Sequence, residues 1–158
     1  MSSFKELKNR RREDYPFVLD YRTRWNDNDM YDHMNNSVYN FLFDSVVNTY
    51  LIEHCGLHPP SSSQYALAVH SHADFFASIA YPAVADLGLR VVKLGKSSVT
   101  YEVALFEQGT EEVKAVSEFV HVFVERDTGK PAKDGMTPIM RSGLERLYNK
   151  PTTTNSKL

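Results

Sequence analysis

The stretch that most constrains the fold is residues 37–54, SVYNFLFDSVVNTYLIEH, which contains no glycine or proline. Its main polar strip recurs at spacings of three or four residues and therefore occupies one narrow face of a helix: Ser37, Asn40, Asp44 and Asn48. Apolar side chains cover nearly all the remaining surface. A helix of this kind is predicted to be buried on almost every side, and Gly56 supplies a stop signal just beyond it.

The segments around this helix are typical of strands. From Phe17 to Trp25 apolar and polar residues alternate, as in a half-buried strand. Beyond the loop HPPSSS the chain shows four more strand-like runs, bounded by Gly, Pro, Ser and Asp turns, at about 64–77, 86–95, 98–107 and 112–125. A short last helix is predicted after Pro138. The sequence thus predicts an α+β domain with an antiparallel sheet wrapped around one helix.

Size and charge narrow the possible functions. A chain of 158 residues fits one domain, and 18 Lys and Arg against 20 Asp and Glu make nucleic acid a poor candidate partner. Residues 1–14 hold a basic cluster, predicted to be a solvated N-terminal arm without a function of its own. No run approaches the roughly 20 apolar residues of a membrane span. The single cysteine, Cys55, excludes an internal disulfide, and no signal peptide is visible, so a reducing compartment is expected.

Small polar residues are concentrated just before the long helix, in RWNDNDMYDHMNNSVYNF at positions 24–41. The start of a helix presents unpaired backbone N–H groups and the positive end of the helix dipole, which suit a developing oxyanion. A carboxylate beside it can activate water or attack a carbonyl directly. The residues alone therefore leave two interpretations open: an acyl-transfer site, or Asn and Asp that only cap the helix and shape a turn.

The stretch RWNDNDMYDHMNNSVYNFLFD resembles the opening motif of the hotdog-fold acyl-CoA thioesterases of the 4-hydroxybenzoyl-CoA thioesterase-like family. The later segments ADFFASIAYPAVADL, LGKSSVTYEV and FVHVFVERDTGKP also resemble the family, so the likeness covers about residues 15–145. It implies a hotdog domain over residues 15–149: a five-stranded antiparallel sheet around one long buried helix. Residues 150–158 are predicted to be a flexible tail.

The resemblance also implies roles for residues of the opening motif. The catalytic carboxylate falls on Asp29, as general base or nucleophile, and the backbone N–H that forms the oxyanion hole falls at or beside Asn36. His33 and Asn35 would line the site or fix its loop, and Asp27 would support it.

One position departs from the family pattern. Asp32 stands where the family has a glycine, and Asp is among the few residues that tolerate a positive φ at such a turn.

Coenzyme A binding is expected at a hairpin and a strand end. Lys96, Ser97, Ser98 and Arg126 offer hydroxyl, N–H and cationic groups to the phosphates and pantetheine chain, although an ordinary surface hairpin explains them equally well. The resemblance implies that coenzyme A, the only cofactor-like group and part of the substrate, binds across a subunit interface. We therefore predict a homodimer or a dimer of dimers, with apolar edge strands such as 99–105 needing a partner.

The His-x-His segment VHSHADF contains residue types that bind metals. His70, His72 and Asp74 share one side of a strand, and their placement on the outer sheet face or at an interface is favoured over a metal site. The other face is predicted to hold Leu67, Val69, Ala73 and Phe75. No metal is predicted.

Three functions remain after these observations. The leading hypothesis is hydrolysis of an acyl-CoA thioester. The alternatives are a non-catalytic acyl-CoA-binding hotdog protein and, with less support, an enoyl-CoA hydratase, whose Asp-x-Asn-Pro-x-His pattern is not matched here because no proline follows Asp27 at that spacing. The acyl group is not predicted.

The last three residues, Ser156, Lys157 and Leu158, form the tripeptide that the peroxisomal import receptor reads. They follow a polar segment that would leave them accessible. In a eukaryotic cell they predict a peroxisomal protein, whereas in a bacterium they carry no meaning and the enzyme would be cytoplasmic.

Overall fold

The computed structural model describes residues 2–148 of the chain. The predicted tail, residues 150–158, lies outside the described residues, and so do Ser156, Lys157 and Leu158. The targeting prediction therefore stays a prediction. Within residues 2–148, no helix has the length and apolar character needed to cross a membrane.

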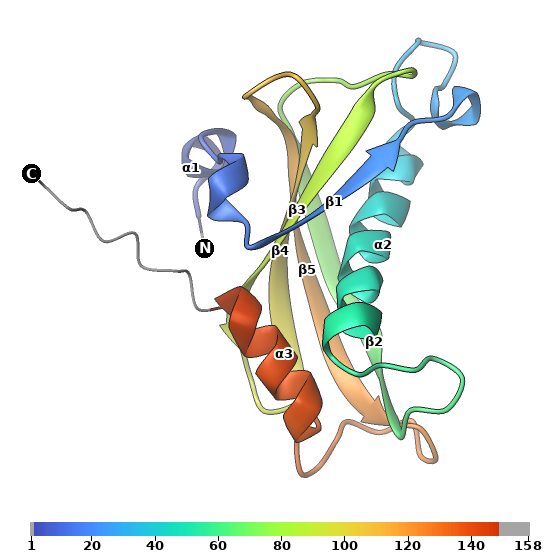
Figure 1. The fold of residues 1–158 in the computed structure, drawn as a ribbon, viewed down its shortest axis with the longest axis vertical. Helices are drawn as coiled ribbons and strands as arrows, with labels where there is room; N and C mark the ends of the chain where they lie inside the picture. Colours follow the sequence, from blue (N-terminus) through green and yellow to red (C-terminus); the bar gives the residue numbers. More distant parts are fainter. Residues whose placement is uncertain (1, 149–158) are drawn as a thin grey trace, which may run out of the picture.

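Five strands form one antiparallel sheet in the order β1-β3-β4-β5-β2 (Figure 1). They are β1 (Phe17–Arg22), β2 (Gln64–Phe75), β3 (Val84–Leu94), β4 (Ser98–Glu107) and β5 (Val113–Glu125). With the long helix α2 (Asn36–His54) packed on the sheet, this is the predicted α+β hotdog fold. The prediction that strand 99–105 lies at an edge was wrong, because β4 is central and the edges are β1 and β2.

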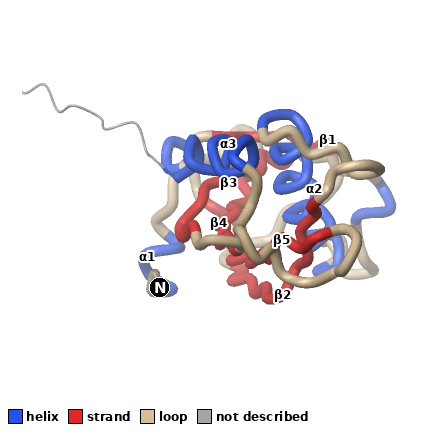
Figure 2. Tube along the Cα trace, turned by 90° about the horizontal axis from the view of Figure 1, so that it is seen from below, coloured by secondary structure: helices blue, strands red, loops and turns tan. Residues whose placement is uncertain are grey.

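Helix α2 begins and ends where the sequence indicates. The side chain of Asn35 accepts a hydrogen bond from the Ser37 N–H at 2.9 Å and caps the first turn. Beyond the helix, Gly56 adopts φ +70°, a left-handed conformation that glycine reaches without strain. The predicted last helix, α3 (Pro138–Tyr148), packs beside α2 on the same face of the sheet (Figure 2).

The prediction that α2 is buried on almost every side was wrong. Its inner face is buried, with Val46, Val47 and Leu51 fully enclosed, but Phe41 is 72% exposed and Ile52 is 47% exposed. The sheet covers one side of the helix and α3 covers part of another. The remaining apolar side has no cover within the described chain.

The first strand is shorter than predicted and ends at Arg22 rather than Trp25. Residues Trp25–Asp27 instead form one 3-10 turn. The carboxylate of Asp27 closes this turn by accepting the Arg24 N–H at 2.7 Å. A side chain that bonds its own local backbone competes with strand pairing, and the chain therefore leaves the sheet before the candidate site.

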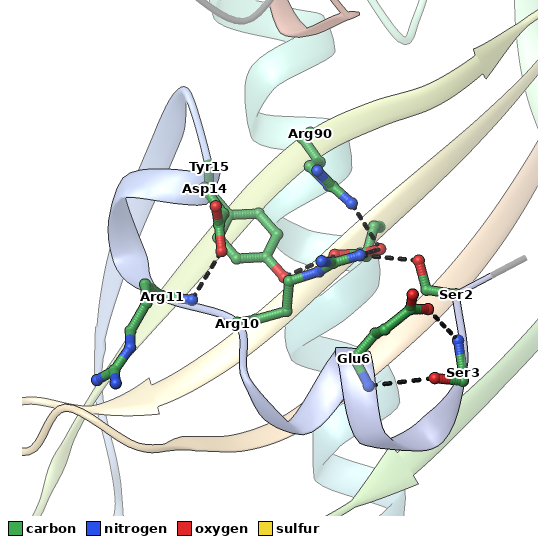
Figure 3. A network of polar contacts seen from close by, with 9 residues as sticks. Ser2, Ser3, Glu6, Arg10, Arg11, Asp14, Tyr15 and Arg90 are labelled. Carbon is green, nitrogen blue, oxygen red and sulfur yellow. Dashed lines mark hydrogen bonds and ion pairs between the residues drawn. The ribbon is translucent and has the colours of Figure 1, made fainter. Parts of the chain in front are cut away.

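Part of the outer face of the sheet is covered by the N-terminal arm, which includes α1 (Phe4–Lys8). The prediction that this arm is solvated holds for Lys5, Lys8 and Arg11, which are exposed, but was wrong for Leu7 and Arg10, which pack on the sheet. Arg10 reaches the carboxylate of Glu102 at 2.7 Å, and Arg90 and the Tyr15 hydroxyl bond the same carboxylate at 3.0 and 2.8 Å (Figure 3). The Tyr15 ring packs over Gly88, where an added Cβ would lie 2.6 Å from it. Two arginines of the basic cluster, Arg10 and Arg12, thus form ion pairs with Glu102 and Asp86 of the sheet.

Candidate active site

Asp29 lies in the loop that connects β1 to α2. The backbone N–H of Asp29 donates to the His33 carbonyl at 2.8 Å, and its Oδ1 accepts the Tyr31 N–H at 2.8 Å. Asp32 adopts φ 60°, the left-handed conformation predicted for this position. Among residues 2–148, no group hydrogen-bonds the second carboxylate oxygen of Asp29. That oxygen is therefore available to a water or a substrate.

The neighbouring acid, Asp27, has a different environment. Its side chain is 1% exposed and accepts hydrogen bonds from Arg24 at 3.0 Å and from the Tyr21 hydroxyl at 3.1 Å. Burial by itself would raise the pKa of Asp27, but hydrogen bonds from the side chain and backbone of Arg24 and from Tyr21 outweigh it and lower the pKa. The carbonyl of Asp27 also accepts the Asn35 N–H at 2.8 Å. Asp27 therefore holds the loop against the helix.

The first turn of α2 leaves one backbone donor available. Asn35 satisfies two N–H groups: its side chain accepts from Ser37, and its carbonyl accepts from Val38 at 2.9 Å. The N–H of Asn36, the first helical residue, has no acceptor among residues 2–148. A free N–H at the positive end of a 19-residue helix is suited to an oxyanion.

A hollow of about 320 Å³ opens beside the Asp29 carboxylate. Asn28, Trp25 and Tyr81 form its walls together with Asp32. The Tyr81 N–H donates to the Asn28 side chain at 3.0 Å, and the Trp25 and Tyr81 rings lie edge to face at 6.0 Å. The sequence analysis missed Asn28 and Tyr81 because they are 53 positions apart, and no local pattern joins them.

A second hollow, of about 490 Å³, lies on the other side of the helix start. Its lining combines Asn36 and Asn40 of α2 with Ser71 and Phe75 of the edge strand β2. Within one chain, Asp29 and Asn36 therefore line different hollows.

His33 is exposed, and its ring makes no hydrogen bond among the described residues. The contact that His33 makes to the loop uses its backbone carbonyl, which accepts the Asp29 N–H.

The residues expected to bind coenzyme A lie at the opposite end of the sheet from Asp29. Strand β3 begins beside the loop of the candidate site and ends at the hairpin that carries Lys96, Ser97 and Ser98, a length of roughly 33 Å at 3.3 Å per residue. The Arg126 guanidinium donates to the Ser62 and Pro59 carbonyls at 2.5 and 2.6 Å. One chain does not bring these residues to Asp29.

The sequence and the fold were compared with known proteins. Residues 23–134 match the family model described as the thioesterase-like superfamily. The chain belongs to this superfamily. No curated protein matches the sequence.

Among solved structures, the PA5185 protein from Pseudomonas aeruginosa is 45% identical, with a TM-score of 0.84 over 87% of this chain and 95% of that one. Two less similar solved structures share the fold. A hypothetical protein from Staphylococcus aureus, solved in complex with CoA, is 18% identical with a TM-score of 0.78 over 87% of each chain. A thioesterase from Thermus thermophilus, complexed with coenzyme A and Zn, is 22% identical with a TM-score of 0.70 over 82% and 98%.

Proposed function

We propose that this member of the thioesterase-like superfamily hydrolyses an acyl-CoA thioester to the free acid and coenzyme A. The observation that carries the proposal is the contrast between two adjacent acids: Asp27 is buried and fully bonded, whereas Asp29 keeps a free carboxylate oxygen beside a hollow. Two proteins of the same fold that were solved with coenzyme A support the substrate class.

The reaction follows from these groups. Asp29 either removes a proton from water as the water attacks the thioester carbonyl, or attacks that carbonyl itself and forms an anhydride that water then opens. The tetrahedral intermediate places negative charge on the former carbonyl oxygen, which the free Asn36 N–H and the helix dipole stabilise. Collapse of the intermediate breaks the C–S bond and releases coenzyme A as a thiolate.

The site is completed by a second copy of the chain. Strand β2 is an edge whose outer backbone groups have no neighbouring strand among residues 2–148. Exposed apolar residues lie on β2 and on α2, namely Phe41, Leu67, Val69 and Phe75. In an antiparallel pairing of two β2 strands, the Gln64 end of one strand lies beside the Phe75 end of the other. Arg126 of the partner subunit, at the Gln64 end, would then approach the hollow that contains Asn36.

Two measurements test the proposal. Release of free thiol from a panel of aromatic, branched and straight-chain acyl-CoAs by the purified protein is expected to show turnover with at least one member. Sedimentation velocity is expected to show a dimer or a dimer of dimers at micromolar concentration. Absence of turnover across the panel from correctly folded oligomer would remove the hydrolase proposal, and a stable monomer would remove the shared site.

The alternative is an acyl-CoA-binding protein without catalysis. The observation that favours it is the separation of Asp29 and Asn36 into different hollows of one chain. Calorimetry with a non-hydrolysable acyl-CoA thioether distinguishes the two functions, because binding of the thioether without any thiol release from the corresponding thioester identifies a binding protein.

A further inference from the structure

Two histidines and a glutamate meet on the outer face of the sheet, beside its β2 edge. His70 and His72 are two positions apart on β2, so their side chains leave the strand on the same side. The register places Glu118 of β5 directly opposite His72. Residues paired in this way on antiparallel strands have Cβ atoms about 5 Å apart, and the three side chains therefore form one cluster.

The distances in this cluster match those of a metal site. His70 Nε2 and His72 Nδ1 are 3.3 Å apart. Two nitrogens that bind a tetrahedral zinc at about 2.0–2.1 Å lie roughly 3.3–3.4 Å from each other. One carboxylate oxygen of Glu118 and the two nitrogens all lie within 4.8 Å of one another. The three side chains therefore offer three candidate ligand atoms in one place.

The local charge also favours a cation. Among residues 2–148, the carboxylates of Glu118 and Asp74 make no ion pair or hydrogen bond. Both residues line a hollow of about 90 Å³ together with His72. Two nearby basic groups, Arg10 and Arg90, both bond Glu102, whereas Lys93 lines a neighbouring hollow with Glu118 but forms no ion pair with it among residues 2–148. Within the described residues, two carboxylates thus lie beside two imidazoles without forming an ion pair.

We propose that His70, His72 and Glu118 bind one zinc-type divalent cation, with water in the fourth position and Asp74 supplying additional negative charge nearby. Two imidazoles and a carboxylate form a nitrogen and oxygen ligand set that zinc accepts. The ion would join the edge strand β2 to β5 next to the register shift between Ala68 and His70. It would leave the backbone groups of the β2 edge free, since the side chains point out of the sheet plane.

Calorimetric titration of the untagged protein with ZnCl₂ tests the site. We expect saturable binding of one ion per chain and a melting temperature that rises with zinc concentration, as linkage requires. The double variant His70→Ala/His72→Ala should lose this binding, and Glu118→Gln should weaken it at least about tenfold. His58→Ala, which removes an exposed histidine outside the cluster, serves as the matched control and should bind as the parent does.

Cobalt gives a second readout that does not depend on heat or stability. Co²⁺ bound through imidazole nitrogens in a four-coordinate site absorbs in the visible region, and addition of Zn²⁺ should abolish this band by displacement. Circular dichroism of each variant establishes that it is folded, which is expected because all substituted side chains lie at the surface or partly exposed. Failure of the parent to bind zinc, or unchanged binding in the double histidine variant, would overturn the proposal.

Discussion

Carboxylates in two regions of the molecule differ in how completely they are hydrogen-bonded. On the outer face of the sheet, Glu102 is 6% exposed and accepts bonds from Arg10, Arg90 and the Tyr15 hydroxyl. In the loop before α2, Asp29 receives one backbone N–H and keeps an oxygen free. A carboxylate with every lone pair satisfied contributes stability, whereas one held in place but incompletely bonded can do chemistry.

The largest expected effect comes from removing the fully hydrogen-bonded carboxylate of Glu102. Glu102→Ala should lower the free energy of unfolding by about 3–5 kcal/mol, because it leaves two arginines partly buried without their shared partner. Urea denaturation measures the change. Glu111→Ala, at an exposed site, is the matched control, and an equal loss in both variants would show that the network contributes nothing of its own.

A buried imidazole sharpens the comparison, because no group among residues 2–148 hydrogen-bonds the Nδ1 atom of His121. His121 is 3% exposed, and burial lowers its pKa from 6.5 to about 4. Between these values the unfolded state binds the proton and the folded state does not, so stability should fall by about 3 kcal/mol as the pH drops from 6.5 to 4. His121→Phe should flatten this part of the stability profile, while His58→Ala should keep it.

The dependence of stability on pH has a second part, at lower pH, that comes from Glu102. Burial opposes ionisation of Glu102, but bonds from Arg10 and Arg90 outweigh it and lower the pKa of Glu102. Its contribution is therefore complete above the unfolded value of about 4.3 and disappears as the pH falls through the lowered pKa. If Glu102→Ala loses the decrease in stability at low pH but keeps the decrease caused by His121, the two contributions come from different groups.

The next prediction compares Asp29 with its buried neighbour Asp27. Asp29→Asn should lower kcat/KM at least about a hundredfold, or roughly 2.7 kcal/mol, with the melting temperature unchanged. Asp27→Asn should act mainly on the melting temperature, because Asp27 is bonded to Arg24 and Tyr21. If Asp27→Asn abolishes turnover in a folded oligomer and Asp29→Asn stays active, the roles are reversed.

The smallest expected effect concerns the helix cap. Asn35→Ala should cost about 1 kcal/mol of stability, because the Ser37 N–H loses its acceptor. Asn35→Asp keeps an acceptor oxygen at this position and should retain most of the stability. Thermal melts of the two variants, compared with the parent, measure the difference. Equal losses in both would show that the side-chain oxygen is not the stabilising group.

The sequence predicted the parts of the molecule that depend on local pattern. The limits of α2 followed from its uninterrupted apolar run and from Gly56, and the positive φ of Asp32 followed from its place in the motif. Contacts between distant segments were not predictable in this way. The pairing of Glu118 with His72 depends on strand register. The register shift between Ala68 and His70 also changes which face Leu67 occupies. Leu67 pairs with Val122 and therefore shares a face with His70 and His72, whereas the alternation of the sequence predicted the other face. The packing of Tyr81 against Asn28 joins two segments that share no pattern.

The position of β2 at the edge of the sheet has a consequence for how the chain acquires its structure. Strands β3, β4 and β5 follow one another through short turns, whereas Gln64 of β2 bonds Glu125, 61 positions later. Closing so long a loop costs entropy before any contact offsets it, so we expect the β3–β4–β5 meander to form first and β2 to join it late. During synthesis, β2 leaves the ribosome well before β5 exists. The backbone groups and apolar side chains of β2 therefore stay unpaired until β5 is synthesised, and we expect chaperones to bind the nascent chain most in that interval.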